Sequence, residues 1–242
     1  MPPAHEDALD HLLARIGQRH GFAEPSLLLS AEGGERAHGA PVLVTFDDGF
    51  RSNHRVAERL LARHGVTAVF FICPGLMDLG AADQSAAVAR LVFRGAVSAP
   101  PPLMSWGEVE ALAAAGHTIA AHTLTHRALA GLPPADLAAE VLQSGERIEQ
   151  RLGRPVDWFA YPFGDIDSID LAAMGVIAGR YRLCRSGVRG LNDAGTDPLG
   201  LLAEPVDLSA PPAYQDLALE GGLDVRHAAA RTRLAALVAA RM

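Results

Sequence analysis

The sequence has few cysteines and no cluster of basic residues, and each absence excludes a class of protein. Cys73 and Cys184 are the two cysteines among 242 residues, and they do not have CxxC spacing. They form no disulfide framework, so they fit a reducing compartment and burial in the core. Asp and Glu outnumber Lys and Arg by 28 to 21, and no basic cluster alternates with aromatic residues. We therefore expect no nucleic-acid partner.

The chain also lacks the apolar segments that a membrane requires. No apolar run approaches the length of ~20 residues that spans a bilayer as a helix. The first residues, Met1 to Asp10, are polar and acidic, without the basic region and apolar core of an export signal. We therefore expect a cytoplasmic protein with no transmembrane segment.

What the sequence does contain is a large apolar fraction and alternating patterns. Hydrophobic residues make up 49% of the chain, enough for a sizeable core, and we expect one domain over residues 1–242. β-branched, aromatic and other apolar runs predict strands at 27–29, 42–46, 67–72, 117–121, 156–160 and 176–184. Helical spacing of apolar residues predicts helices near 9–16, 56–61, 85–93, 105–115, 133–152, 169–174 and 225–240. Ser105 and Glu108 have capping-box spacing, and glycines predict a turn at 32–39.

Strands that alternate with helices predict an α/β fold with right-handed βαβ units and a parallel sheet, either open or closed into a barrel. In both arrangements, functional residues lie at the carboxyl ends of the strands. Three polar segments directly follow predicted strands: Asp47 with Asp48, His122 with His126, and Tyr161–Asp165. We therefore expect these segments to meet at one rim of the sheet.

His122, His126 and Asp48 offer the ligands of a divalent metal ion. Alone, each motif has another explanation, because an Asp-Gly pair favours a turn and a lone HxxxH pair can simply end a strand. Together, two imidazoles and a carboxylate favour zinc, with cobalt, nickel or manganese as alternatives, and they leave a position open for water. Asp47 is then free to act as a general base, which predicts hydrolysis of a carbonyl compound.

Three segments, Thr45–Gly49, His122–His126 and Tyr161–Gly164, resemble the first three motifs of the NodB-type polysaccharide deacetylases, carbohydrate esterase family 4. The segment 105–117 also resembles the helix and strand that precede the histidine motif in that family. The resemblance is strongest over residues 40–185 and weaker over 1–39 and 186–242. It implies a distorted (β/α) barrel with fewer than eight full β/α units.

The resemblance also implies roles for individual residues. Asp47 would be the catalytic base, and Asp48, His122 and His126 the metal ligands. The backbone N–H of Phe163 would donate to the oxyanion of the tetrahedral intermediate. Further candidates for substrate contacts are Tyr161, Pro162, Asp165 and Trp106.

Two departures from the family pattern concern the base and the general acid. Ala160 stands where the family often has an arginine that supports the catalytic carboxylate, and Arg185 or Arg189 is the candidate replacement. A late Leu-x-His motif, which supplies the general acid, is absent, and His227 is a weak substitute because it begins a predicted helix. Asp47, once protonated, could return the proton to the leaving group itself.

The sequence therefore predicts a metal-dependent hydrolase that removes acetyl groups, most simply N-acetyl groups, from a carbohydrate or a sugar-containing precursor. Two alternatives stay open. The same metal centre could hydrolyse another C–N bond, such as a cyclic amide. The chain could also be a non-catalytic protein that binds a glycan or a partner on a degenerate deacetylase scaffold. The sugar, its linkage, the metal and the oligomeric state do not follow from the sequence.

Overall fold

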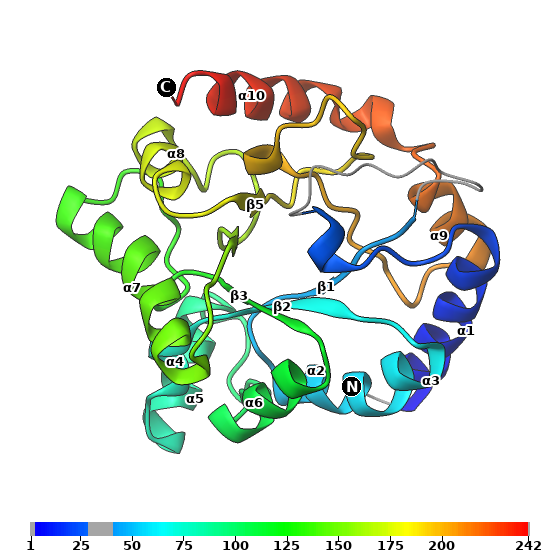
Figure 1. The fold of residues 1–242 in the computed structure, drawn as a ribbon, viewed down its shortest axis with the longest axis horizontal. Coiled ribbons are helices and arrows are strands. Elements are labelled where there is room, and N and C mark those ends of the chain that lie inside the picture. The colour runs from blue at the N-terminus through cyan, green and yellow to red at the C-terminus, as the bar shows by residue number, and fades with distance from the viewer. Residues whose placement is uncertain (1–2, 29–40, 242) are drawn as a thin grey trace.

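A computed structural model of the protein describes residues 3–28 and 41–241 (Figure 1). Five parallel strands form one sheet whose order in space is the order in the chain. They are β1 (Val44–Phe46), β2 (Ala68–Ile72), β3 (Thr118–Ala121), β4 (Trp158–Ala160) and β5 (Leu183–Arg185). The sheet curls into a half-barrel, and no pairing between β1 and β5 closes it within the described residues. The predicted α/β fold, a barrel of fewer than eight units, is confirmed.

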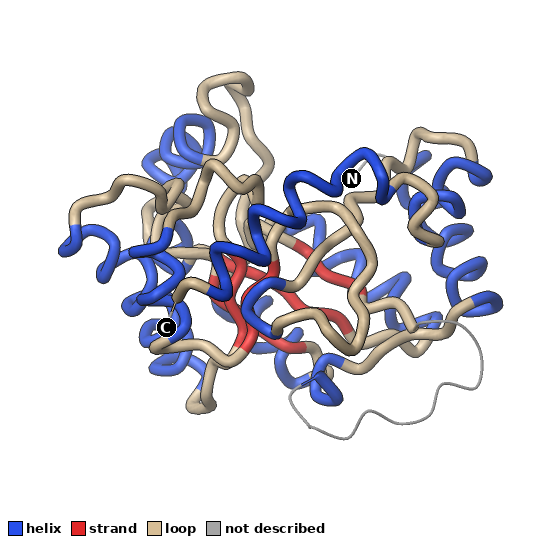
Figure 2. The backbone as a smooth tube through the Cα atoms, turned by 90° about the horizontal axis from the view of Figure 1, so that it is seen from above, coloured by secondary structure: helices blue, strands red, loops and turns tan. Residues whose placement is uncertain are grey.

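Helices surround the strands, which lie at the centre of the molecule in both views (Figures 1 and 2). The α-helices are α1 (Pro3–Arg19), α2 (Arg51–Val56), α3 (Ala62–His64), α4 (Pro74–Met77), α5 (Ala81–Leu91), α6 (Trp106–Ala114), α7 (Pro134–Leu152), α8 (Leu171–Ala178), α9 (Pro212–Leu219) and α10 (Ala228–Ala239). A π-helical turn, Ala57–Leu61, joins α2 to α3. Short 3₁₀ helices lie at Pro25–Leu28, Pro198–Gly200 and Asp224–His227. Among the described helices, none is both long and apolar enough to cross a membrane.

The two faces of the sheet are buried in different clusters because side chains alternate along each strand. Phe70, Ile72 and Phe159 face the helices and belong to the larger cluster. On the other face, inside the curl, lies a smaller cluster made of Val69, Phe71, Ala120, Trp158, Ala160 and Leu183. Burial on both faces explains why the strands are continuous apolar runs rather than alternating ones.

The predicted start of α6 is confirmed in atomic detail. The Ser105 hydroxyl accepts a hydrogen bond from the Glu108 N–H at 3.3 Å, and the Glu108 carboxylate accepts one from the Ser105 N–H at 2.6 Å. The two side chains thus satisfy two N–H groups that the first helical turn leaves without partners.

Two predicted strands were wrong in whole or in part. Residues 25–28 form a 3₁₀ helix instead of the strand expected at 27–29, of which Leu29 lies outside the described residues. The strand expected at 176–184 is confined to its last residues, because α8 continues to Ala178. Asp170 caps α8 by accepting from the Ala173 N–H at 2.9 Å, which favours the helix over the β-branched preference of Val176 and Ile177. The turn expected at 32–39 lies outside the described residues.

Candidate metal centre

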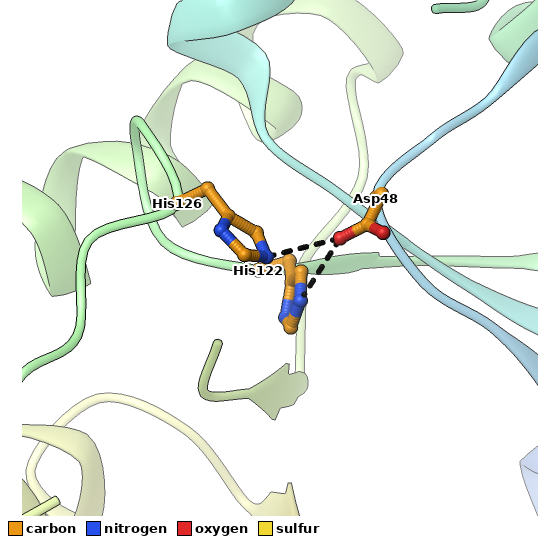
Figure 3. A group of neighbouring side chains, drawn as sticks. All are labelled: Asp48, His122 and His126. Atoms are coloured by element: carbon orange, nitrogen blue, oxygen red, sulfur yellow. Dashed lines mark ion pairs between the residues drawn. The ribbon is translucent and has the colours of Figure 1, made fainter. Parts of the chain in front are cut away.

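The carboxyl ends of β1 and β3 bring together Asp48, His122 and His126 (Figure 3). The Oδ1 atom of Asp48 lies 3.1 Å from Nε2 of His126 and 3.5 Å from Nε2 of His122. The candidate ligand atoms all lie within 4.8 Å of one another. The three residues predicted as metal ligands therefore lie together in the structure.

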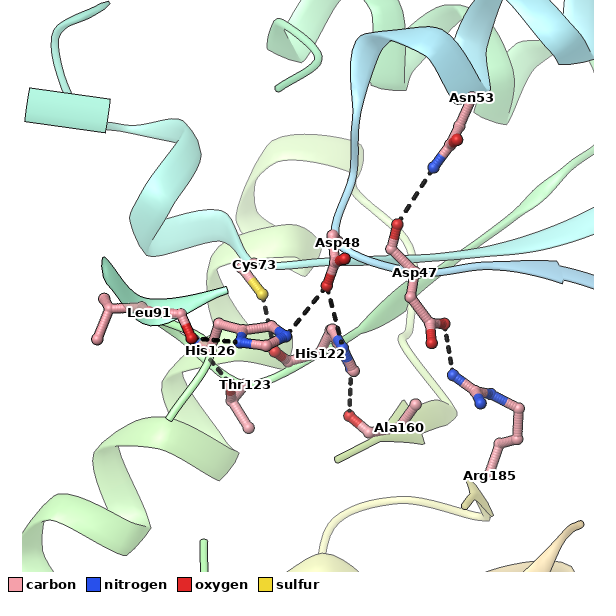
Figure 4. A network of polar contacts seen from close by, with 10 residues as sticks. All are labelled: Asp47, Asp48, Asn53, Cys73, Leu91, His122, Thr123, His126, Ala160 and Arg185. Carbon is pink, nitrogen blue, oxygen red and sulfur yellow. Dashed lines mark hydrogen bonds and ion pairs between the residues drawn. The ribbon is translucent and has the colours of Figure 1, made fainter. Parts of the chain in front are cut away.

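Both imidazoles are held with Nε2 facing Asp48, because Nδ1 of each ring is used elsewhere. Nδ1 of His122 donates to the carbonyl oxygen of Ala160 at 2.7 Å, and Nδ1 of His126 donates to that of Leu91 at 3.3 Å (Figure 4). A carbonyl can only accept, so Nδ1 of each ring carries a hydrogen. The Nε2 atom donates to Asp48 when the ring is protonated and presents its lone pair when the ring is neutral. This arrangement is typical of histidines that bind a metal.

Opposing effects set the charges of this cluster. Burial alone would raise the pKa of Asp48, but hydrogen bonds and charge from His122 and His126 hold it well below its usual range. Burial alone would lower the pKa of His122, but the hydrogen bond to Asp48 and the charges of Asp47 and Asp48 raise it. The carboxylate is therefore ionised and prefers a cation beside it.

The loop between the two histidines is anchored by Glu140, a buried residue of α7. Its carboxylate accepts hydrogen bonds from the backbone N–H of Thr125, at 2.8 Å, and from the Thr125 hydroxyl. The backbone carbonyl of Glu140 accepts from the Leu124 N–H at 2.9 Å. Sequence reasoning missed Glu140, although an acid three residues after Leu137, on the buried face of the predicted helix, was a signal.

Five non-glycine residues in the described part of the chain have a positive φ angle, a conformation that L-residues rarely adopt. They are Asp48, Arg94, Thr123, His126 and Phe163. Four of them belong to the three predicted motifs, and the fifth, Arg94, contacts Phe163. Such strain persists where the surroundings enforce it, and it clusters at functional sites.

Asp47 points away from the cluster and pairs with Arg185 of β5 (Figure 4). Nη2 of Arg185 donates to Oδ1 of Asp47, and the Asp47 carbonyl accepts from the Asn53 side chain at 3.1 Å. The Asp47 side chain is 40% exposed, whereas that of Arg185 is 11% exposed. The Asp47 carboxylate therefore faces the open rim, and the Arg185 guanidinium lies behind it. Of the two predicted arginines, Arg185 makes the contact, while Arg189 pairs with Glu204.

Arg185 lies next to Ala160, the position at which the resemblance to the family leads us to expect an arginine. Ala160 and Arg185 are register partners in the parallel pair of β4 and β5. Partners in adjacent strands point to the same face of a sheet, so the guanidinium reaches Asp47 from one strand further along at the same height. The guanidinium also packs over the ring of Phe71, with Cζ of Arg185 4.9 Å from the ring centroid.

The third motif forms a tight turn at the end of β4. Phe163 and Gly164 have φ angles of 66° and 69°. A Cβ atom on Gly164 would lie 2.5 Å from the backbone nitrogen of Gly187, so only glycine fits there. The Phe163 ring meets the His126 ring edge to face, with centroids 4.9 Å apart. The motif thus packs directly against a candidate metal ligand.

The other predicted contacts are placed differently. Tyr161 is 1% exposed and packs in the core, and Pro162 is buried. Asp165 is exposed, but its carboxylate accepts from the Asp167 N–H and the Ser168 hydroxyl. Trp106 donates to Asp78 at 2.9 Å and lines a separate cavity of about 390 Å³ with Asp78, Arg147, Gln150 and Arg151.

His227 and Cys73 complete the set of predicted residues. His227 lies at the junction of the last 3₁₀ helix and α10, and none of its contacts in the described structure joins it to Asp47 or to the cluster. Cys73, at the end of β2, is buried as expected, and its thiol donates to the His122 carbonyl at 2.9 Å.

Comparison with known proteins gives a family match and a set of similar structures. The family model for polysaccharide deacetylases matches residues 34–175. A search of curated proteins finds no match.

Three solved structures illustrate the likeness. The Streptococcus pyogenes deacetylase PplD in complex with acetate aligns with a TM-score of 0.71 and 18% identity, over 88% of this chain and 86% of that protein. A putative polysaccharide deacetylase from Bacillus anthracis aligns with a TM-score of 0.65 and 16% identity, over 88% of this chain and 60% of that protein. A de-N-acetylase from Aggregatibacter actinomycetemcomitans aligns with a TM-score of 0.64 and 18% identity, over 85% of both. At these identities the likeness concerns the fold.

Proposed function

The chain belongs to the polysaccharide deacetylase family, and we propose that it is a metal-dependent hydrolase that removes acetyl groups, most simply N-acetyl groups, from a carbohydrate or a sugar-containing precursor. The observation that carries this proposal is the cluster of Asp48, His122 and His126, with both Nε2 atoms turned toward one carboxylate oxygen. The deacetylase structures to which the chain is similar support the choice of reaction.

The cluster fits a divalent metal ion. Ligand atoms ~2.0–2.2 Å from a tetrahedral ion lie ~3.3–3.6 Å from one another, and the two Asp48 to histidine distances are 3.1 and 3.5 Å. Imidazole and carboxylate donors favour zinc, while cobalt, nickel and manganese accept the same donors. When bound, such an ion polarises the acyl oxygen and makes water more acidic.

Asp47 is the proposed general base. Its carboxylate lies next to the cluster in sequence but is not one of the three candidate ligands, so it is free to take a proton. The hydrogen bond from Arg185 fixes the orientation of the Asp47 carboxylate. As water adds to the acyl carbon, Asp47 accepts a proton from it. Asp47 then returns that proton to the amine nitrogen as the C–N bond breaks, which leaves acetate and a free amine.

The backbone N–H of Phe163 is the proposed donor to the oxyanion that forms on the acyl oxygen. A donor of this kind can contribute about 2.7–4 kcal/mol to the stability of the transition state. The close backbone contact between Gly164 and Gly187 holds the turn that carries this N–H. Among the candidate substrate contacts, Asp165 is exposed enough to meet a sugar, whereas burial gives Tyr161 a packing role.

The contact between Arg185 and Asp47 bears on the non-catalytic alternative. That alternative rested on Ala160 and on the missing late histidine. Arg185 now supplies the guanidinium from β5, which removes the first of these two reasons. Hydrolysis of another C–N bond stays open, since the metal site does not select the acyl group.

The test is to measure bound metal and acetate release together. Purified protein is assayed with N-acetylated oligosaccharides and cyclic amides, before and after metal removal. Acetate release that is lost on metal removal, restored by metal addition and abolished in Asp47→Asn supports the proposal. Full activity in Asp47→Asn or in the metal-free protein would refute it.

A further inference from the structure

Arg94 lies over the face of Phe163, at the edge of the candidate metal centre. Its Cζ atom is 3.6 Å from the centroid of the Phe163 ring, and that ring in turn contacts His126. Arg94 is three residues beyond Leu91, whose carbonyl holds His126 (Figure 4). The end of α5 and the turn after it therefore contact the site twice, through the Leu91 carbonyl and through the Arg94 side chain.

The backbone at Arg94 has a conformation that L-residues rarely adopt. Arg94 has a φ angle of 50° and Gly95 one of 81°, so two successive residues are left-handed. The turn is fixed by hydrogen bonds from the Gly95 N–H to the Ala89 carbonyl at 2.8 Å and from the Ala96 N–H to the Phe93 carbonyl at 2.9 Å. Glycine or asparagine would adopt this conformation at lower cost than arginine. The other non-glycine residues with positive φ in the described chain all lie in the site, which points to a functional reason for Arg94.

The charge of Arg94 is available to a ligand. The side chain is exposed, and no carboxylate in the described residues forms an ion pair with it. Arg185, by contrast, is committed to Asp47, and Arg127 is committed to Asp136. Stacking on Phe163 leaves the N–H groups free, because they lie in the guanidinium plane and point outward from its edge.

We propose that Arg94 is a substrate-binding residue that selects acetylated glycans carrying an anionic group, a carboxylate or a phosphate, next to the acetylated sugar. The proposal rests on the proposed deacetylase function and specifies its substrate class. A guanidinium edge binds either anion with two parallel hydrogen bonds. The net charge of the chain is −7, so a local cation without a carboxylate partner among the described residues, such as Arg94 next to Phe163, favours the binding of an anionic substrate.

The experiment compares three matched substrates: a neutral N-acetylglucosamine trimer, the same trimer with a 6-phosphate on the middle sugar, and the same trimer with a 6-carboxylate there. Wild type, Arg94→Gln, Arg94→Lys and a control, Arg90→Gln, are compared. Arg90 is an exposed residue of α5 one turn earlier. We expect Arg94→Gln to lower kcat/KM for the anionic trimer it recognises about 10–100-fold, the effect of losing a charged hydrogen bond. In Arg94→Gln, kcat/KM for the neutral trimer should change less than about threefold. For the anionic trimer, kcat/KM of Arg94→Lys should lie between the values of wild type and Arg94→Gln, since lysine keeps the charge but cannot donate two parallel hydrogen bonds.

Comparison of the two anionic trimers shows which anionic group Arg94 recognises. The dependence of KM on added salt gives a second measurement. A preference for the phosphorylated trimer indicates phosphate recognition, and a preference for the carboxylated trimer indicates an acidic sugar. Raising ionic strength should increase KM for the preferred anionic trimer and leave KM for the neutral trimer unchanged. An equal loss on neutral and anionic trimers in Arg94→Gln would overturn the proposal, because Arg94 would then only support Phe163.

Equilibrium binding separates this proposal from the proposed function. The same trimers are titrated into wild type and Arg94→Gln by calorimetry. Anion-selective binding that is lost in Arg94→Gln, together with no acetate release, would refute the deacetylase and keep the anion site. Acetate release with no difference in affinity between the neutral and anionic trimers would keep the deacetylase and refute the anion site.

Discussion

Arg185 and Asp47 are 138 residues apart in the chain, yet the arginine donates directly to the carboxylate. Arg185 is also the register partner of Ala160, the position from which the family often supplies this arginine. The guanidinium that contacts Asp47 therefore comes from β5, the strand next to the one that carries Ala160.

Removing the guanidinium should impair catalysis more than folding. We expect Arg185→Ala to lower kcat about 10–100-fold, part of the 10²–10⁴-fold that a well-placed base contributes. The measurement is acetate release at saturating substrate, with folding of the variant checked by circular dichroism. Arg189→Ala is the matched control because Arg189 pairs with Glu204. An unchanged kcat in Arg185→Ala would contradict the supporting role.

Moving the arginine back should restore part of the lost activity. Ala160 is fully buried beside Phe71 and Trp158, so Ala160→Arg alone should destabilise the protein by crowding. In the double variant Ala160→Arg/Arg185→Ala, the truncated side chain makes room on the same face of the sheet. We expect kcat of the double variant to exceed that of Arg185→Ala. Equal kcat values in both would show that position 160 does not reach Asp47.

Metal binding should stabilise the protein more strongly as pH rises. The pKa of His122 is raised above its usual value in the metal-free protein. Its protonated form therefore stabilises the metal-free fold below about pH 6.5, and this stability is lost as pH rises through the folded pKa. A metal ion needs the neutral imidazole, so its effect has the opposite sign. We expect the metal-induced rise in Tm to be larger at pH 8 than at pH 5.5, and to be small in His122→Gln at both. A rise in Tm that does not change with pH would contradict this linkage.

Glu140 should control metal affinity without touching the metal. In Glu140→Gln one of the two oxygens that accept from Thr125 becomes an NH₂ group, so the Thr125 hydroxyl has to accept instead of donate, and both hydrogen bonds lose the charge of the carboxylate. Changes to groups that orient ligands typically cost 10–100-fold in metal affinity, and we expect a loss within that range. The measurement is competition with a chelator, with Glu146→Gln, an exposed residue of the same helix, as control. Unchanged affinity in Glu140→Gln would show that the loop holds His126 unaided.

The capping box of α6 should give a pH-dependent contribution to stability. Burial opposes ionisation of Glu108, but hydrogen bonds from Ser105 and the charge of Arg51 lower its pKa below the usual value. The stability it contributes is therefore present above about pH 4.5 and is lost as pH falls through the folded pKa. We expect Glu108→Ala to cost about 1 kcal/mol in the free energy of unfolding at pH 7. The difference should close in acid, and urea unfolding at several pH values measures it. Glu110→Ala, at an exposed position of α6, should show neither effect.

The sequence was sufficient to predict the strand ends that carry Asp48, His122 and His126, because each is a hydrophobic run followed directly by polar residues. The sequence also limited the candidate partners of the Asp47 carboxylate to two arginines, Arg185 and Arg189. The choice between them depended on strand register, which no local pattern in this chain contains.

Other site features could not be predicted because they arise from contacts between distant elements. Leu91 and Glu140 reach the site only once α5 and α7 pack against the loop after β3, and Arg94 reaches it by contact with Phe163 after β4. Short apolar runs such as 27–28 and 176–178 fit a helix or a strand equally well, and neighbouring residues decide between them.

The order of the strands has a consequence for how the protein is made. Each strand pairs with the strand before it in the chain, so the sheet can grow in the direction of synthesis. The three candidate ligands have all emerged once residue 126 is complete, but Asp47 gains its guanidinium only after Arg185 has emerged. A nascent chain that ends between β4 and β5 therefore holds a site that could bind metal before its base has support. The last strand in the chain is therefore the one that carries the arginine that contacts Asp47.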